Sequence, residues 1–483
     1  MAENKEDNRI CWRCVTERFL RAKIRKQGES ARCDYCRKQA NTLSISEVAD
    51  EVRGAFDRHY IRTPAGPSED EEFMYRDSDL NWQREGEPST YAIAATAGVD
   101  EVAAEDIRAV LEETTGMSPD ENFARDPDDE DEFSEEAQYA EKDVDATTIY
   151  RGWQHFKVSL RTEARLFNST AQATLDSIFA GLDGHSTRAG RKVIVDAGPE
   201  QKLRSLHRAR LFQSLDKLSE ALKRPDLHLG PPPSELATAG RMNARGIAVF
   251  YGATHKEVAV GETRPPVGSH VLHGRFEIIR PLRLLDVEAL RAIFVKGSIF
   301  DPEHLERLKK ASFLAHVSKQ ITLPVMPDDE PFEYLVTQAI ADYLANLLAP
   351  QLDGLIYRSV QHGEHKNNVV LFHKSARVEL LEIPAGTEIS AYTTSHDDEG
   401  QHADFRVIEN VPAPKHKGAG NKEFDTGFLP HAGPAAPKDQ RIAALRVDIE
   451  SISVDRVEGA SYSAEEFLVR RHRFTRSARI RRT

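Results

Sequence analysis

All four cysteines of this 483-residue chain lie near its N-terminus. They form two Cys-x-x-Cys pairs, Cys11 with Cys14 and Cys33 with Cys36, with 18 residues between the pairs. Two such pairs can hold one ion, and this spacing is typical of a tetrahedral structural zinc site. Two disulfides are the alternative, but they belong mainly to secreted proteins. Because four thiolates leave no open coordination position, we predict a structural rather than a catalytic Zn²⁺.

The distribution of charge limits the classes of partner. The formal net charge of −13 argues against a general nucleic-acid-binding protein. Basic residues nevertheless surround the cysteines and fill the tail from Arg470 to Arg482. Either region fits nucleic acid. A solvated basic face is the alternative for the cysteine-rich region, and contact with an acidic part of the same chain is the alternative for the tail.

The start of the chain and its hydropathy bear on location. Residues Met1 to Asp7 are mostly polar, and no apolar segment follows them as it would in a signal peptide. No stretch approaches the roughly 18 apolar residues that a membrane-spanning helix needs. We therefore expect a cytoplasmic protein without membrane contact.

Composition and periodicity divide the chain into four predicted segments. Residues 1–42 form the zinc ribbon, and residues 43–145 form a helical region that ends in an acidic linker around Pro127 to Glu136. Residues 146–385 alternate between helical and strand patterns, and residues 386–483 form a C-terminal extension with the basic tail. Within the helical region, apolar spacing predicts helices over 45–60 and 99–115.

The central segment, residues 240–262, carries the functional interpretation. The apolar run 247–251 predicts a strand that ends at Tyr251, and a Thr-x-x-Glu spacing at Thr254 predicts a capping box that starts a helix. Such a helix would turn Glu262 toward its apolar face. Burial of a carboxylate is costly unless the charge is paired or used, so Glu262 is a candidate catalytic group. A solvated helix end is the alternative.

This segment resembles the RES-domain family, which is named after an Arg, a Glu and a Ser. The resemblance rests on Gly-Arg-Met-Asn from Gly240, on Tyr251 with the Ala-Thr that closely follows it, and on Glu-Thr-Arg-Pro from Glu262. Arg208 stands in a predicted strand at the position of the family's first functional Arg, although His207 replaces the usual Tyr.

Further matches lie toward the C-terminal side. Tyr334 and Gln338 are similar to a Tyr-x-x-x-Gln pair of the family. Ser359 ends a predicted strand at the position of the namesake Ser, and Asn368 with Phe372 follows as Asn-x-x-x-Phe. The match covers roughly residues 153–372, somewhat under half of the chain.

The resemblance implies an α+β fold with a mixed sheet, similar to ADP-ribosyltransferases, and cleavage of the bond between nicotinamide and ribose in NAD. Nicotinamide needs no general acid to leave, so one carboxylate that stabilises the ribosyl cation suffices, and Glu262 suits that role. Tyr251 offers a flat face for nicotinamide or ribose, and Ser359 a hydroxyl that orients either one. Arg208 and Arg241 suit the pyrophosphate, since guanidinium groups bind phosphate oxygens in pairs.

The acceptor of the ribosyl group stays open between phosphate, water and a protein side chain. The resemblance favours phosphate, which gives nicotinamide and ADP-ribose 1''-phosphate, with Arg210 and Gln338 as further substrate ligands. A toxin-like or defence effector of this kind would be restrained by an antitoxin, by another regulatory partner or by its own N-terminal half.

Two other functions compete with NAD cleavage. The chain is alternatively a zinc-ribbon nucleic-acid-binding or adaptor protein with a degenerate RES region. Longer members of the family also often carry a helical domain of the HEPN type before the RES domain, and residues 43–145 resemble such a domain. Arg53 and His59 fit the loose Arg-x(4–6)-His pattern of HEPN ribonucleases.

Overall fold

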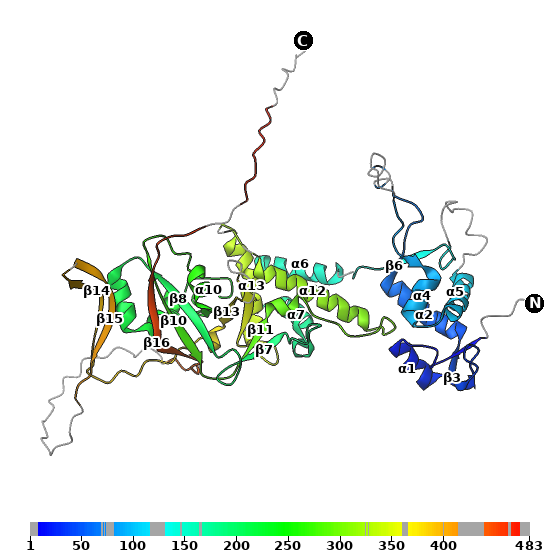
Figure 1. Ribbon diagram of the computed structural model, residues 1–483, viewed down its shortest axis with the longest axis horizontal. Helices are drawn as coiled ribbons and strands as arrows, with labels where there is room; N and C mark the ends of the chain where they lie inside the picture. Colours follow the sequence, from blue (N-terminus) through cyan, green and yellow to red (C-terminus); the bar gives the residue numbers. More distant parts are fainter. Residues whose placement is uncertain are drawn as a thin grey trace, which may run out of the picture. The chain divides into compact units, whose positions relative to one another are not determined.

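The structure is a computed structural model (Figure 1). It describes residues 8–68, 71, 73, 82–115, 131–144, 147–163, 167–323, 325–326, 328–359, 366–398, 400–413, 439–461 and 465–473. The first part of the predicted acidic run and the end of the predicted basic tail lie outside these residues.

The main sheet has eight strands in the order β16-β10-β8-β9-β13-β12-β11-β7. Strand β10 (His270–Ile278) pairs antiparallel with both of its neighbours, whereas β11 (Leu282–Asp286) and β12 (Gly354–Arg358) run parallel. The predicted α+β fold with a mixed sheet is therefore confirmed. No helix in the described part of the chain is both long and apolar enough to cross a membrane.

The chain divides into two compact units. Unit 1 comprises residues 1–195, 240–244 and 283–357, and unit 2 comprises residues 196–239, 245–282 and 358–483. The four segments predicted from composition are not tested by this division.

Unit 1 begins with a small sheet and a helical layer. The sheet contains β1 (Arg9–Cys11), β3 (Gln39–Ser44) and β2 (Glu29–Arg32) in that order, with α1 (Arg18–Gln27) between β1 and β2 in the chain. The helices are α2 (Ile45–His59), α4 (Ser89–Ala97) and α5 (Glu101–Thr115). The helices predicted over 45–60 and 99–115 are thus confirmed. A second small sheet joins β4 (Tyr60–Arg62), β6 (Gln138–Glu141) and β5 (Glu87–Pro88).

A loop that precedes α12 (His304–Thr322) contributes to the core of this N-terminal part. Phe300 is 1 % exposed and belongs to the same apolar cluster as the α2 and α5 side chains. Arg58 donates to the carbonyl of Ile299 at 3.5 Å, and the rings of His59 and His304 lie 6.0 Å apart. The loop and the C-terminal end of α2 therefore form one buried junction.

The remainder of unit 1 is mainly helical. Besides α12 it contains α6 (Thr147–Thr162), α7 (Ser169–Phe179), α11 (Val287–Leu290) and α13 (Glu330–Asn346). Trp153 of α6 stacks on Phe156 and meets Phe313 of α12 edge-on, which holds these helices together. The strand β7 (Ile194–Ala197) lies at the end of the main sheet.

Unit 2 carries the strands on which the candidate site is built. They are β8 (Ser205–Phe212), β9 (Phe250–Ala253), β10, β13 (Asn367–Leu371) and β16 (Leu445–Arg456). Its helices are α8 (Leu215–Lys223), α9 (Pro225–His228) and α10 (Lys256–Glu262). A separate hairpin joins β14 (Glu388–Asp397) and β15 (Gly400–Asn410).

Two local predictions in the central segment differ from the structure. The strand starts at Phe250 rather than at residue 247, because the carbonyl of Ala248 accepts a bond from the His373 ring instead of joining the ladder. The predicted capping box at Thr254 is wrong, since α10 has His255 as its N-cap and no side-chain cap. The Thr254 hydroxyl is engaged with the backbone of Asn367.

Candidate functional site

The centre of the candidate site is the carboxylate of Glu262 at the last residue of α10. The side-chain amide of Asn368 donates to its Oε1 at 2.7 Å, and the hydroxyl of Ser359 donates to the same oxygen at 3.3 Å. Both donors are buried, at 6 % and 1 % exposure, whereas Glu262 itself is exposed. The carboxylate of Glu262 is therefore accessible to solvent, and one of its two oxygens is held by two buried donors.

The sequence of α10 explains how Glu262 reaches this position. Val258 and Ala259 are buried and pack with Ala253 of β9 and Ala209 of β8. This contact fixes the helix on the sheet, and Glu262 follows one turn after Val258. The sequence predicted an apolar face that carried Glu262, and the structure instead places the side chain at the rim of that face.

Asn368 is the functional candidate that sequence reasoning did not single out. The residue was noted as part of an Asn-x-x-x-Phe match, without a role. Its register provides the explanation, because Asn368 pairs directly with Ala253 across β13 and β9. Directly paired residues point to the same face of a sheet, which is the face that α10 covers. Only the strand pairing, which the sequence did not reveal, brings this amide to the carboxylate.

Tyr251 lies on the same sheet face as Asn368. It is two residues from Ala253 on β9, and side chains at that spacing share a face. It also pairs directly with Val370 of β13. Three predicted catalytic residues, Tyr251, Glu262 and Ser359, thus belong to one region of unit 2.

Arg208 points to the opposite face of the sheet. Its neighbour Ala209 packs under α10, and adjacent strand residues point to opposite faces. The Arg208 guanidinium lies over the Phe250 ring at 4.8 Å and donates to the carbonyl of Tyr251 at 2.8 Å. Burial, reinforced by the nearby charge of Arg210, lowers the pKa of Arg208 to about 10. The contacts of Arg208 support the backbone of β9 rather than place a charge beside Glu262.

Arg210 follows the same alternation as Arg208. It is exposed and donates to the carbonyl of His228 in α9 at 2.9 Å. Its predicted role in phosphate binding stays a prediction.

The predicted ligands Arg241 and Gln338 lie together in unit 1. Gln338 donates to the carbonyls of Gly240 and Asn243 at 2.8 and 3.0 Å, which closes the turn that contains Arg241. Arg241 donates to the carbonyl of Ile321 at 2.6 Å and stacks over the Tyr334 ring. These contacts stabilise a turn, and a role of either residue in substrate binding stays a prediction.

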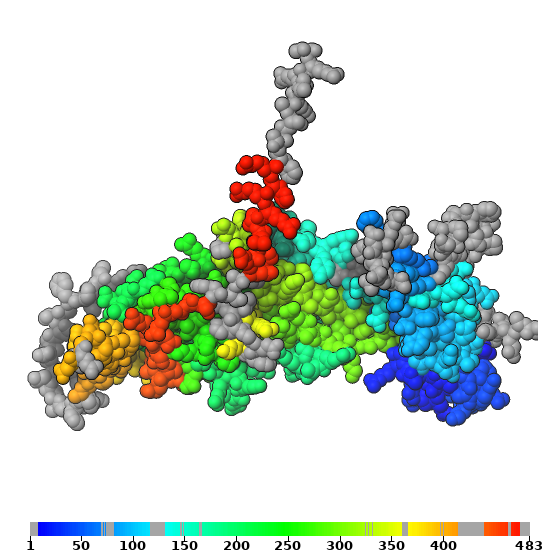
Figure 2. Space-filling model, turned by 45° about the horizontal axis from the view of Figure 1, so that its top comes forward, coloured from blue at the N-terminus to red at the C-terminus, as the bar shows by residue number. Residues whose placement is uncertain are grey.

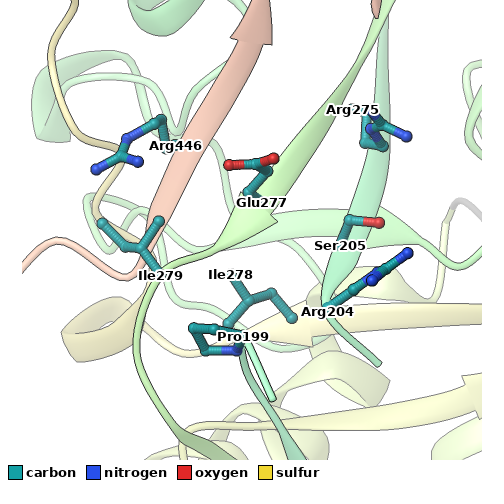
Figure 3. Close-up of a pocket in the computed structure, with 8 residues that line it drawn as sticks. All are labelled: Pro199, Arg204, Ser205, Arg275, Glu277, Ile278, Ile279 and Arg446. Atoms are coloured by element: carbon teal, nitrogen blue, oxygen red, sulfur yellow. The ribbon is translucent and has the colours of Figure 1, made fainter. Parts of the chain in front are cut away.

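A polar pocket of about 440 Å³ lies elsewhere in unit 2, on β8, β10 and β16 (Figure 3). None of the predicted site residues lines it. Arg275 and Arg446 form ion pairs with Asp448 and Glu379, and the guanidinium groups of Arg446 and Arg204 point to opposite sides in Figure 3. The pocket therefore does not converge on one anion. Its lining is Pro199, Arg204, Ser205, Arg275, Glu277, Ile278, Ile279 and Arg446.

The four cysteines form one cluster in unit 1. Their ligand atoms all lie within 4.8 Å of one another, and the closest sulfur pairs are 3.6 to 3.8 Å apart. A tetrahedron with Zn–S bonds of about 2.3 Å has edges of about 3.8 Å. These distances are too long for disulfide bonds, and the cluster could bind a metal ion such as zinc.

The thiols differ in their surroundings. Burial raises the pKa of Cys11 and Cys14, whereas the backbone N–H of Lys38 lowers the pKa of Cys36 to about 7. A divalent ion would favour the thiolate form of all four, so metal binding would release protons. No ligand atom from outside the cluster is needed, which agrees with a structural site.

The predicted ribonuclease pair does not form a common site in α2. Arg53 is exposed and His59 is 9 % exposed. Six residues along a helix separate them by about 240°, so the two side chains leave different faces.

Comparison with known protein families gives a match to part of the chain. Residues 210–394 match the RES domain family. No curated protein and no solved structure matches the chain. The match covers less than half of the chain, and no comparison assigns a HEPN domain to the region before it. The chain therefore carries a RES domain, of a family associated with NAD-degrading toxins, together with an N-terminal cluster of four cysteines.

Proposed function

We propose that the RES domain of this protein cleaves the nicotinamide–ribose bond of NAD. The observation that carries the proposal is the exposed Glu262 carboxylate, fixed through Oε1 by Asn368 and Ser359. Its second oxygen, Oε2, accepts no bond from the described residues. A carboxylate that is already oriented stabilises developing positive charge without reorganising at the moment of reaction.

The chemistry requires one anionic group and no general acid. Nicotinamide leaves as a neutral ring because its nitrogen carries the positive charge in NAD. The ribose then develops oxocarbenium character, which Glu262 stabilises by its charge or through a ribose hydroxyl. Tyr251, on the same sheet face, supplies an aromatic surface for the nicotinamide or the ribose.

Arg208 acts in this proposal as a positioning residue. Its bond to the Tyr251 carbonyl and its contact with Phe250 hold β9, the strand that carries Tyr251. Arg210 and Arg241 remain the proposed ligands for phosphate groups, on the basis of the family resemblance alone.

Phosphorolysis is the proposed reaction, with nicotinamide and ADP-ribose 1''-phosphate as products. The biological role that follows is a toxin-like or defence effector, restrained by an antitoxin or another regulatory protein. Ribonuclease activity through Arg53 and His59 is disfavoured by the burial of His59.

Product analysis tests the proposal. The purified protein is incubated with NAD, with and without inorganic phosphate, and nicotinamide and the ADP-ribosyl products are separated chromatographically. We expect nicotinamide release that depends on phosphate, with ADP-ribose 1''-phosphate as the second product. ADP-ribose alone would show hydrolysis, and wild-type protein that leaves NAD intact under all conditions would refute NAD cleavage.

A matched pair of variants ties the reaction to the site. Glu262→Gln keeps the size of the side chain and removes its charge, so nicotinamide release should fall by roughly 100-fold or more. Glu257→Gln, in the first turn of the same helix, is the control and should leave the rate near that of the wild type. Equal rates for both variants would remove Glu262 from the mechanism.

A further inference from the structure

Three arginines surround one aromatic ring beside the cysteine cluster. Trp12 lies between Cys11 and Cys14, and the guanidinium carbons of Arg13, Arg21 and Arg25 lie 5.2, 5.1 and 5.4 Å from the centre of its ring. Arg21 and Arg25 are one turn apart on α1, so both reach the same ring. We refer to these four residues as the Trp12–arginine cluster.

None of these arginines has a counter-ion in the described part of the chain. Three carboxylates of this N-terminal part have other partners. Glu17 accepts from the N–H of Leu20 as the cap of α1, Asp34 accepts from the N–H of Arg9, and Glu51 pairs with Lys23. Three exposed guanidinium groups are thus gathered in one place with only the ring to attract them. Attraction to a ring is modest at an exposed site, so the gathering leaves a concentrated positive charge.

The charge of the surrounding module is opposite to that of the chain. Residues 8–44 contain ten Lys and Arg against three Asp and Glu, whereas the whole chain carries a net charge of −13. Arg18 adds a further exposed cation on the same face of α1 as Arg21 and Arg25. Figure 2 shows this N-terminal segment, coloured dark blue, at the surface. A local potential of this kind attracts polyanions.

The aromatic content of the surface distinguishes the kinds of polyanion. Guanidinium planes that stack on an indole keep their outer faces free, and nucleobases stack on such faces as well as on aromatic rings. Bases must be unstacked from a duplex to use these surfaces, which favours a single strand. An acidic protein segment would use the charges but not the rings.

We propose that the Trp12–arginine cluster is a binding site for single-stranded nucleic acid. The guanidinium groups take the phosphates through paired N–H donors, and Trp12 with the arginine planes around it takes the bases. Phosphate contacts and base stacking tolerate any base, so binding is expected to depend on strand form and salt more than on sequence. The cysteine cluster fixes the backbone at Trp12, because Cys11 and Cys14 on either side of it both belong to that cluster.

The test measures the binding of fluorescein-labelled dT20 and rU20 to the full-length, zinc-loaded protein by anisotropy at several salt concentrations. The variant Arg21→Glu/Arg25→Glu should weaken binding at least tenfold and lower the salt slope by about 1.4, or about 0.7 for each lost phosphate contact. The control Arg151→Glu/Arg204→Glu reverses two exposed arginines elsewhere and changes the net charge equally. It should leave the affinity within about twofold of the wild type.

A second variant and two competitors separate the alternatives. Trp12→Ala keeps all charges and should still weaken binding severalfold, because the platform for the bases is lost. Zinc content and circular dichroism confirm that each variant is folded. Absence of wild-type binding, equal losses in the two double variants, or equal competition by a duplex or by polyglutamate would overturn the proposal. Since the readout is binding, these outcomes are independent of NAD turnover.

Discussion

Asn368 donates a hydrogen bond of 2.7 Å to Oε1 of Glu262, across 106 residues of chain. The amide is buried while the carboxylate that it fixes is exposed, and Ser359 donates to the same oxygen at 3.3 Å. The arrangement resolves two requirements that conflict in a plain surface carboxylate. The charge stays accessible to a substrate, and its direction is set by groups that water does not reach.

Loss of the Asn368 amide should reduce turnover without preventing substrate binding. Asn368→Leu removes the donor, and a hydrogen bond to a charged group is worth about 1.5–3 kcal/mol. If that amount appears mainly in the transition state, kcat for nicotinamide release falls roughly 10- to 150-fold while KM for NAD changes little. The control Asn346→Leu removes a side-chain amide that donates to the Asp342 carbonyl within α13. An unchanged kcat in Asn368→Leu would show that the amide does not position Glu262.

The pH–rate profile distinguishes an electrostatic effect of residue 368 on Glu262 from a purely structural one. Asn368→Asp places a second carboxylate next to Glu262, and two adjacent carboxylates do not readily ionise together. We expect the acidic limb of the profile to move to higher pH in this variant. A profile of unchanged shape and reduced height would instead indicate simple disruption of packing.

Ser359→Ala should have a smaller effect than Asn368→Leu. The Ser359 bond is longer by 0.6 Å and therefore weaker, so its loss should reduce kcat about 3- to 10-fold. The double variant tests coupling, because two donors on one oxygen should not contribute additively. A larger loss in Ser359→Ala than in Asn368→Leu would mean that the hydroxyl contacts the substrate directly.

The contacts of Arg208 predict a fold-related rather than a substrate-related effect. Arg208→Met removes the donor to the Tyr251 carbonyl and leaves an apolar side chain over Phe250. We expect a loss of about 1.5–3 kcal/mol in stability, seen as a lower Tm, with kcat reduced and KM for NAD nearly constant. A raised KM at unchanged Tm would return Arg208 to the pyrophosphate ligands that the family resemblance implies.

The contrast between Glu262 and Arg208 shows which part of a site can be predicted from sequence. Local patterns placed a helix before Glu262 and a strand at Arg208, and both were confirmed. The sheet face to which a strand side chain points depends on the pairing register, and its surroundings depend on which helices cover that face. Ala209, not Arg208, lies under α10, and no spacing within β8 distinguishes the two.

Pairing between distant strands accounts for the other omissions. Asn368 meets Glu262 because β13 pairs with β9, and this partner is not encoded in either segment alone. Conversely, Cys-x-x-Cys spacing is local and its geometry is nearly fixed by the ion, so the cysteine cluster could be predicted. The capping box at Thr254 failed because a long-range bond to Asn367 engaged the hydroxyl.

Removal of the metal should unfold the N-terminal part of unit 1. Binding of a structural zinc ion contributes about 10–16 kcal/mol in small zinc modules, far more than a three-stranded sheet of this size provides. We expect one zinc per chain by elemental analysis. A chelator should red-shift Trp12 emission and speed amide exchange in α1. Cys33→Ser should lack the ion and the chelator response, and full protection without zinc would contradict a structural role.

The buried junction between α2 and the loop before α12 should loosen at acidic pH. Burial lowers the pKa of both His59 and His304 below the ordinary value of about 6.5. The nearby charges of His304 and Arg58 lower the pKa of His59 further, and that of Arg307 lowers the pKa of His304 further. Asp301 acts in the opposite direction on His304. The Nε2 of His59 and the Nδ1 of His304 are buried without a hydrogen-bond partner. An added proton would therefore place charge on a buried ring, offset in part by Asp301 at His304.

The sign of the pH dependence follows from the lowered pKa values. Below about pH 6.5 the unfolded junction binds protons that the folded junction resists, so stability falls as the pH falls through that range. Each imidazole contributes at most about 1.4 kcal/mol of stability per pH unit until its pKa in the folded protein is reached.

Amide exchange in α2 and residues 297–304 should be faster at pH 5.5 than at pH 7.5, beyond the intrinsic change of exchange rate with pH. The double variant His59→Phe/His304→Phe should flatten this difference. The control His155→Phe, which replaces an exposed histidine of α6, should retain it. A pH response equal in all three proteins would assign the effect to other histidines and contradict the junction as its source.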